Sequence, residues 1–236
     1  MMILQIEKEM RQAANMQKAK ILAGFFKTSK GQYGEGDKFL GITVPTQRTI
    51  AKKYFYEISI NEIQRLINSR YHEHRLLGFI MLTLKYPRAT DKDKKTIYNF
   101  YLKNAKRANN WDLVDLSAPN VVGAYLMDND RKILYKLARS KNLWEKRISI
   151  ISTFTLIRAK QFDDTLKIAN ILMADTHDLI HKAVGWMLRE VGKRDRTILV
   201  KYLAKRYKKM PRTMLRYAIE KFPEKERKYY LTKVSQ

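Results

Sequence analysis

The spacing of the apolar residues most constrains the fold, because they recur every three or four positions along much of the chain. Three segments show this spacing clearly: Trp144, Ile148, Ile151 and Phe154, then Phe162, Leu166, Ala169 and Leu172, then Ile180, Ala183, Met187 and Val191. The period is that of amphipathic α-helices, and no alternating β-branched run is long enough to indicate a strand. The sequence therefore predicts an all-α protein with helices of roughly 12 to 18 residues. Asn109-Asn110, Asp175-Thr176 and Asp195 are candidate caps of helix starts.

Pairs of predicted helices recur at roughly 35 to 40 residues, which is the period of helical-hairpin solenoids such as HEAT repeats. The repeat is weak at the level of sequence identity, so an irregular helical bundle stays an alternative. We expect residues 1–236 to form a single HEAT-like-repeat domain, because a chain of this length can bury one core.

The charge balance requires an anionic partner. Lys and Arg total 48 against 23 for Asp and Glu, a formal net charge of +25. Nucleic acid, a ribosomal surface or an anionic membrane would each satisfy it. The 45% hydrophobic content excludes a disordered basic tail. No apolar run approaches the ~20 residues that span a bilayer, and residues 1–23 do not resemble a secretory segment, so we expect a cytoplasmic protein.

The chain has no cysteine, which excludes disulfides, thiolate nucleophiles and cysteine-ligated metal centres. His177 and His181 have the spacing of a zinc-binding pair, but the intervening acid is Asp178 and no third ligand is evident, so we expect no metal site. His72 and His74 lie in a polar stretch, and we expect both to face solvent.

Ser29–Asp37 holds three of the nine glycines and predicts a flexible connector. A phosphate-binding loop is the alternative, but the Gly-Lys-Ser/Thr ending of a Walker motif is absent. After it, Thr43 is a candidate helix cap and Pro45 lies near the first turn. Helix N-termini bind phosphate well, so we expect this helix start to suit DNA.

Trp111 and Asp115 are four residues apart, so on a helix an indole and a carboxylate share one face. Pro119 limits how far that helix runs. The alternative is that Trp111 belongs to the core and that Asp115 is a solvated or capping residue.

Trp186 lies on a predicted basic face, because Lys182, Arg189 and Lys193 fall four before, three after and seven after it. An aromatic ring among cations is typical of a nucleic-acid-binding surface. The alternative is that Trp186 packs at the edge of the core.

Three further arginines are candidates for phosphate contacts. Arg147 falls on a largely apolar helix, where a guanidinium needs a carboxylate or a phosphate. Arg212 and Arg216 share one face of a later helix and could both contact a DNA backbone. A solvated face is the alternative for this pair.

Three ordered motifs together resemble the DNA alkylation repair family: Trp111-Asp-Leu-Val-Asp115, Leu143-Trp-Glu-Lys-Arg147 and Ala183-Val-Gly-Trp-Met-Leu-Arg-Glu190. The resemblance spans about Phe39 to Phe222, and its members include the HEAT-like-repeat (AlkD-like) alkylpurine DNA glycosylases. It implies a superhelical array of antiparallel HEAT-like or ARM-like helix pairs, an α-solenoid with a basic concave groove.

The resemblance also implies roles for individual residues. Trp111, Asp115 and Trp186 resemble the catalytic trio of the family, and Arg147 resembles the arginine beside it. Arg48 and Arg189 match positions that contact DNA phosphates. We add Thr43, Lys182, Lys193, Arg212 and Arg216 as further expected DNA contacts.

The implied activity is excision of positively charged purines, of the 3-methyladenine or 7-methylguanine type, from double-stranded DNA in base excision repair. The implied enzyme is a monomer that needs no metal or organic cofactor. A non-catalytic DNA-binding helical-repeat protein and a protein-interaction scaffold stay alternatives.

Overall fold

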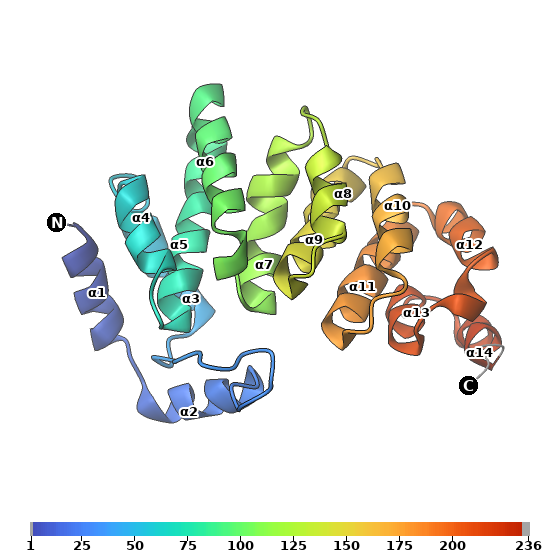
Figure 1. The fold of residues 1–236 in the computed structure, drawn as a ribbon, viewed down its shortest axis with the longest axis horizontal. Helices are drawn as coiled ribbons and strands as arrows, with labels where there is room; N and C mark the ends of the chain where they lie inside the picture. Colours follow the sequence, from blue (N-terminus) through green and yellow to red (C-terminus); the bar gives the residue numbers. More distant parts are fainter. Residues whose placement is uncertain (1, 233–236) are drawn as a thin grey trace. The chain divides into compact units, whose positions relative to one another are not determined.

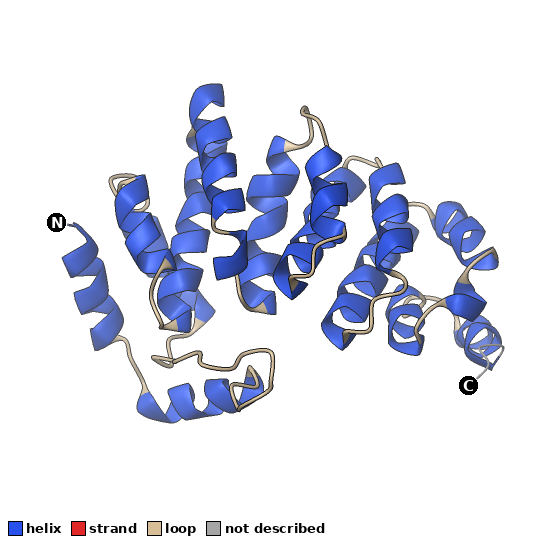
Figure 2. Cartoon of the chain, in the orientation of Figure 1, coloured by secondary structure: helices blue, strands red, loops and turns tan. Residues whose placement is uncertain are grey.

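The computed structural model describes residues 2–232, and within them the chain is helical without any strand (Figures 1 and 2). The first helices are α1 (Met2–Gln12), α2 (Met16–Phe25), α3 (Val44–Tyr54), α4 (Ile60–Ile67), α5 (His72–Lys85), α6 (Asp91–Lys103) and α7 (Trp111–Ala118). The others are α8 (Lys132–Ala138), α9 (Leu143–Arg158), α10 (Asp163–Leu172), α11 (Asp178–Arg194), α12 (Arg196–Ala204), α13 (Arg212–Ala218) and α14 (Glu224–Thr232). The all-α prediction is confirmed.

The described chain groups into two compact units, unit 1 ending at Val121 and unit 2 starting at Val122. The single-domain organisation of residues 1–236 stays a prediction. None of the described helices combines the length and apolar character needed to cross a bilayer.

The helices of unit 2 form two layers. The first layer contains α9, α11 and α13, because α11 packs against both of the others. In the second layer, α8 and α10 pack against each other and against α9, while α12 packs against α11. This is the packing of stacked helical hairpins, in which each pair covers the apolar face of the next.

Unit 1 repeats the pattern. α1 packs against α3, and α5 packs against both α3 and α7, so these four odd-numbered helices form one layer. α4 packs against α5, and α6 packs against the short turns at 86–88 and 105–107 that flank it. α2 departs from the repeat, because none of its residues is buried and Met16, Ile21 and Phe25 are exposed.

The repeat is shorter than the predicted 35 to 40 residues. Helix pairs begin at residues 60 and 91 in unit 1 and at 132, 163 and 196 in unit 2, intervals of 31 to 33 residues. The helices themselves are shorter too, since α8 and α13 have only seven residues each. The apolar spacing is correct, because Ile148, Ile180 and Met187 are fully buried.

Capping side chains define several helix starts. Thr43, Asn110 and Asp195 accept backbone N–H groups at the starts of α3, α7 and α12, as predicted. The predicted cap at Asp175-Thr176 is wrong by one to two residues, because His177 caps α11. Asp175 instead accepts the N–H of His177 at 2.8 Å.

Gly185 lets α11 and α13 approach closely, because a Cβ there would lie 2.5 Å from the Met214 carbonyl oxygen and 2.5 Å from the Tyr217 Cβ. We predict that Gly185→Ala lowers the free energy of unfolding by about 1–3 kcal/mol, the cost of overpacking against atoms that cannot move away. Chemical denaturation measures it. Gly192→Ala on the same helix is the control, because its nearest contact is the end of the flexible Leu199 side chain. Equal losses in the two variants would contradict this explanation.

Candidate functional site

The predicted site residues share one feature in each unit: all belong to the odd-numbered layer. In unit 1, Thr43 caps α3, Arg48 lies on α3, and Trp111 and Asp115 lie on α7. The candidates of unit 2 lie on α9, α11 and α13, and they are Arg147, Lys182, Trp186, Arg189, Lys193, Arg212 and Arg216. None lies on α4, α6, α8, α10 or α12.

The start of α7 presents an indole and a carboxylate. Asn110 caps the helix and its Oδ1 accepts the Trp111 N–H at 2.8 Å. Trp111 and Asp115, one helical turn apart, are both half-buried, whereas Asp112 between them is buried. α7 ends at Ala118, and Pro119 begins a π-helical turn, as the proline predicted.

Two phenylalanines at the end of α2 pack against the Trp111 ring. The Phe26 ring centroid lies 5.3 Å from that of Trp111, and the Phe25 centroid lies 6.0 Å away in an edge-on arrangement. Phe26 is buried, but 62% of Phe25 is exposed. The sequence reasoning missed this contact, for which the aromatic pair just before the glycine-rich segment is the available signal.

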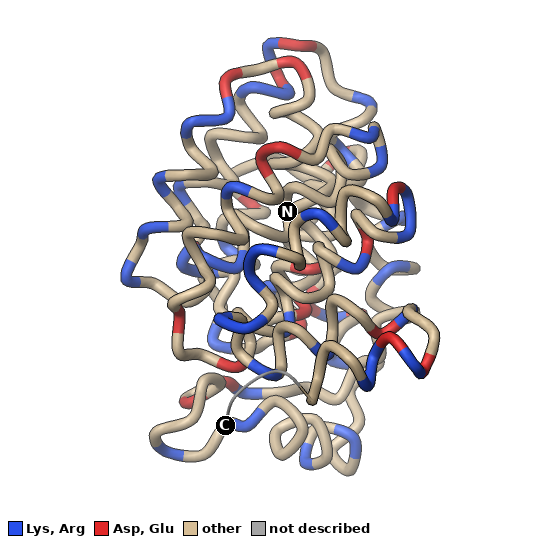
Figure 3. The backbone as a smooth tube through the Cα atoms, turned by 90° about the vertical axis from the view of Figure 1, so that its right-hand side faces the viewer, with Lys and Arg blue, Asp and Glu red and all other residues tan. Residues whose placement is uncertain are grey.

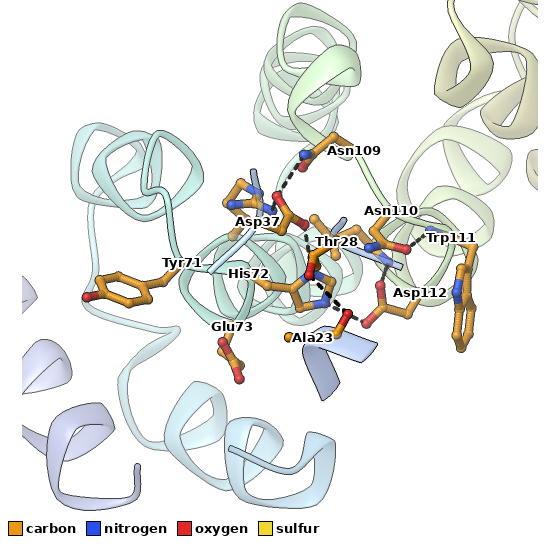
Figure 4. A network of polar contacts seen from close by, with 12 residues as sticks. Ala23, Thr28, Asp37, Tyr71, His72, Glu73, Asn109, Asn110, Trp111 and Asp112 are labelled. Carbon is orange, nitrogen blue, oxygen red and sulfur yellow. Dashed lines mark hydrogen bonds and ion pairs between the residues drawn. The ribbon is translucent and has the colours of Figure 1, made fainter. Parts of the chain in front are cut away.

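A buried polar network lies behind Trp111 (Figure 4). His72 Nε2 lies 2.8 Å from the Asp112 carboxylate, and His72 Nδ1 lies 3.4 Å from that of Asp37. Asp37 also accepts a 2.6 Å hydrogen bond from Arg75 and a 3.1 Å hydrogen bond from Asn109. The prediction that His72 faces solvent is wrong, because only 2% of it is exposed. His74 is half-buried.

The network makes His72 a cation. Burial by itself lowers the pKa of His72, but the charge and hydrogen bond of Asp112 and the hydrogen bond of Asp37 outweigh burial and raise it to about 9. Burial raises the pKa of Asp37, but hydrogen bonding to His72 and the charge of Arg75 bring it below its usual value. Two carboxylates and two cations therefore compensate one another inside unit 1.

Backbone contacts fix the residues that follow the glycine-rich segment. Glu73 accepts the backbone N–H groups of Leu40, Gly41 and Ile42 at 2.9, 2.8 and 3.3 Å. Gly41 has φ +79°, and a Cβ there would lie 2.0 Å from the Asn15 carbonyl oxygen. The segment connects α2 to α3 and ends in Asp37, whose side chain is only 5% exposed. Because Asp37 follows a run of glycines, its sequence context gave no signal of burial.

The start of α3 is open to solvent. Thr43 and Arg48 are exposed, and Thr43 Oγ1 lies 2.9 Å from the Thr46 hydroxyl and 3.5 Å from the Thr46 N–H. An exposed, capped helix start with an arginine in the second turn combines two features that bind phosphate.

In unit 2, α9 and α11 hold Arg147 and Trp186. Arg147 is buried and donates from Nη1 to the Leu179 carbonyl at 2.6 Å. Trp186 is half-buried and packs against Phe154 with ring centroids 5.9 Å apart. Arg158 lies over the same Phe154 ring, 4.2 Å from its centroid, so a cation contacts the ring against which Trp186 packs. The basic face predicted from Lys182, Arg189 and Lys193 stays a prediction.

The candidate cations of α11 already have carboxylate partners. Lys182 lies 2.7 Å from Asp178, Lys193 lies 2.7 Å from the buried Glu190, and Arg189 pairs with Glu220. Arg212 and Arg216 on α13 are exposed. Figure 3 shows that Lys and Arg are distributed along most of the backbone, with Asp and Glu between them.

The two histidines of the zinc-like spacing have other partners. His177 Nδ1 accepts the Leu179 N–H at 3.1 Å, and His181 Nε2 lies 2.5 Å from the Asp175 carbonyl oxygen. Among residues 2–232, no group of three or more acidic, His or Cys side chains is arranged to hold a metal ion.

Comparisons with known proteins agree on one family. A family model described as DNA alkylation repair enzyme matches residues 6–222. A solved structure described as a predicted DNA alkylation repair enzyme from Enterococcus faecalis is similar, with a TM-score of 0.71 and 15% identity. The similarity covers 89% of this chain and 97% of that chain, and it shows a shared fold. A search of curated proteins gave no match.

The ion pair of His72 predicts a pH-dependent stability. The pKa of His72 is higher in the folded state than the usual 6.5, so the pair stabilises fully below pH 6.5 and its contribution is lost as pH rises through about 9. We predict that Asp112→Asn lowers the free energy of unfolding by about 3 kcal/mol at pH 6, and that its difference from wild type narrows toward pH 9.5. Denaturant unfolding across this range measures both. Asp91→Asn, at a fully exposed side chain, serves as control. If the difference in free energy of unfolding between Asp112→Asn and wild type stays constant from pH 6 to pH 9.5, His72 and Asp112 do not form an ion pair.

Proposed function

The chain belongs to the DNA alkylation repair enzyme family, and from this we propose that it is an alkylpurine DNA glycosylase. The family resemblance of the three motifs is confirmed. The proposed reaction is hydrolysis of the N-glycosidic bond of positively charged purines, of the 3-methyladenine or 7-methylguanine type, in double-stranded DNA. We propose that the protein acts as a monomer on the DNA of the nucleoid in the cytoplasm.

The chemistry of such a substrate sets what the protein must supply. Alkylation at N3 or N7 gives the purine a positive charge, so the bond from C1′ to the base breaks with its electron pair leaving on a neutral purine. The sugar becomes cationic and resembles an oxocarbenium ion. Water then adds to C1′ and loses a proton, which leaves an abasic site. A carboxylate near the sugar stabilises this state and orients the water, and neither a metal nor an organic cofactor is needed.

Asp115 is the carboxylate that best fits this role, and its position on α7 is the observation that carries the proposal. α7 has two carboxylates, of which Asp112 is buried beside His72 and Asp115 is half-buried, one turn from Trp111. A half-buried carboxylate can reach a substrate while its charge is less screened than in water. The Trp111 indole next to it would contact the cationic nucleotide, worth about 0.5 to 2 kcal/mol.

Residues of unit 2 have proposed roles of the same kind. Trp186 would contact a nucleotide of the bound DNA through its half-exposed ring. Arg147, whose Nη1 is held by the Leu179 carbonyl, would offer a fixed positive charge to a DNA phosphate. A guanidinium fixed in this way loses little side-chain entropy when it meets a phosphate or carboxylate.

DNA contacts are proposed for the exposed start of α3, with Thr43 and Arg48, and for the basic residues of α11 and α13. These are Lys182, Arg189, Lys193, Arg212 and Arg216. Since the three cations of α11 pair with carboxylates, their net contribution to phosphate binding is smaller than that of an unpaired cation. Substitution of Arg48 is therefore expected to change DNA binding more clearly than substitution of a cation on α11.

For catalysis, we predict that Asp115→Asn lowers the single-turnover rate of base release from methylated duplex DNA by about 100-fold or more. Affinity for the duplex is unchanged or slightly higher, because loss of a negative charge cannot weaken phosphate binding. Release of free base is measured with a metal chelator present, and Asp91→Asn is the matched control. Equal rates for Asp115→Asn and wild type would remove Asp115 from the mechanism. Tight duplex binding without release by wild type would favour a non-catalytic DNA-binding protein.

For binding, we predict that Arg48→Ala weakens affinity for unmodified duplex DNA and reduces the slope of log K against log salt by about 1, as expected for one lost phosphate contact. Fluorescence anisotropy at several salt concentrations measures the slope. Lys95→Ala removes an exposed cation from α6, outside the odd-numbered layer, and is expected to leave the slope unchanged. If Arg48→Ala and Lys95→Ala change the salt slope equally, the DNA-binding surface is not restricted to the odd-numbered layer.

A further inference from the structure

The buried histidine of unit 1 has no part in the proposed chemistry. His72 is 2% exposed and forms contacts that lead toward Trp111 by two separate routes. Burial of a charged imidazole carries a desolvation penalty that its partners must offset, so those partners are held in fixed positions around it.

The first route is through the backbone of α7. His72 Nε2 donates to Asp112 at 2.8 Å, and Asp112 is the residue directly after Trp111 in the first turn. The other oxygen of Asp112 accepts the Leu113 N–H at 2.9 Å. Together with the Asn110 cap, these bonds fix the backbone on both sides of Trp111.

The second route is through aromatic rings. The His72 ring lies 4.8 Å from the Phe26 ring and 4.7 Å from the Phe39 ring, and these two phenylalanines stack on each other at 5.3 Å. Phe26 is also the ring that packs against Trp111, tilted by 30° at 5.3 Å. An imidazolium beside two aromatic rings is attracted to their faces, which adds to the packing.

We propose that His72 is a positioning residue that fixes the Trp111 indole, through Asp112 at the start of α7 and through the shared Phe26 ring. Its importance for base release rests on the proposed function, whereas its effect on the Trp111 ring does not. Asp37 extends the same network into the glycine-rich segment, so the segment, α5 and α7 are held by one set of charges.

The charge of His72 is the part of the network that can be titrated. Asp37 faces it from the connector, Asp112 from α7 and Arg75 from its own helix α5. Their combined effect raises the pKa of His72 to about 9, so raising the pH through this value removes its charge in the intact protein. If His72 positions Trp111, the surroundings of the indole change over the same pH range.

The experiment uses the full chain labelled with 5-fluorotryptophan. The three tryptophans give three fluorine NMR signals, and Trp111→Phe identifies the Trp111 signal by its loss. We expect the Trp111 signal of wild type to shift between pH 7 and pH 10 with a midpoint near 9. In His72→Gln, which keeps a donor toward Asp112 but removes the ring and the charge, this titration is absent and the Trp111 signal is displaced or broadened at pH 7.

His74→Gln is the matched control, because His74 lies on the same helix two residues away and contacts Ser69 and Tyr71 rather than the network. It is expected to retain the titration of Trp111. On methylated duplex DNA, His72→Gln is expected to lower the single-turnover rate about tenfold, while the dissociation constant changes by less than about threefold, since misplacement of a contacting group affects the reacting state most.

A Trp111 signal that stays constant in wild type from pH 7 to pH 10 overturns the proposal, whether or not His72→Gln folds. A His72→Gln variant whose Trp111 signal matches that of wild type also overturns it. Absence of base release by wild type would contradict the proposed function alone, because the NMR titration is measured without DNA.

Discussion

Most helices of the described chain are too short to be stable alone, and the rest of the structure depends on this constraint. They have 7 to 17 residues, and isolated helices below about 12–15 residues are marginal in water. Each must therefore bury an apolar face against its neighbours. In both units the odd-numbered helices meet side by side, and most other helices cover them. In each unit the candidate site residues lie on these odd-numbered helices or at their starts.

Buried charge is the second determinant of unit 1. His72, Arg75, Asp37 and Asp112 come from three segments and are removed from water together. Any one of them alone would be strongly unfavourable, so the segments must fold as a set. The connector thereby becomes part of the support of α7. A glycine-rich segment that looks flexible by composition is held at its end by charges and by the backbone contacts of Glu73.

Acidic side chains, which are fewer than the basic ones in this protein, form ion pairs with Lys and Arg. Glu190 is buried and contacts Lys193 at 2.7 Å and Arg194 at 3.0 Å. Burial raises the pKa of Glu190, but its bonds to these two cations hold it below the usual value. Many of the acidic residues pair in this way. The formal net charge of +25 that remains favours association with polyanions.

The sequence by itself determined the helical class, several helix starts and the placement of Trp111 and Asp115 one turn apart on one helix, because periodicity, caps and a spacing of four are local properties. It overestimated helix length, since apolar spacing does not mark where turns begin. Only the tertiary structure decided that His72 is buried and charged. Its partners Asp37 and Asp112 lie 35 and 40 residues away in sequence, and its own polar neighbourhood suggests solvent. A pairing that depends on chain segments meeting in space leaves no local pattern, because each charge is compensated only after the fold has formed.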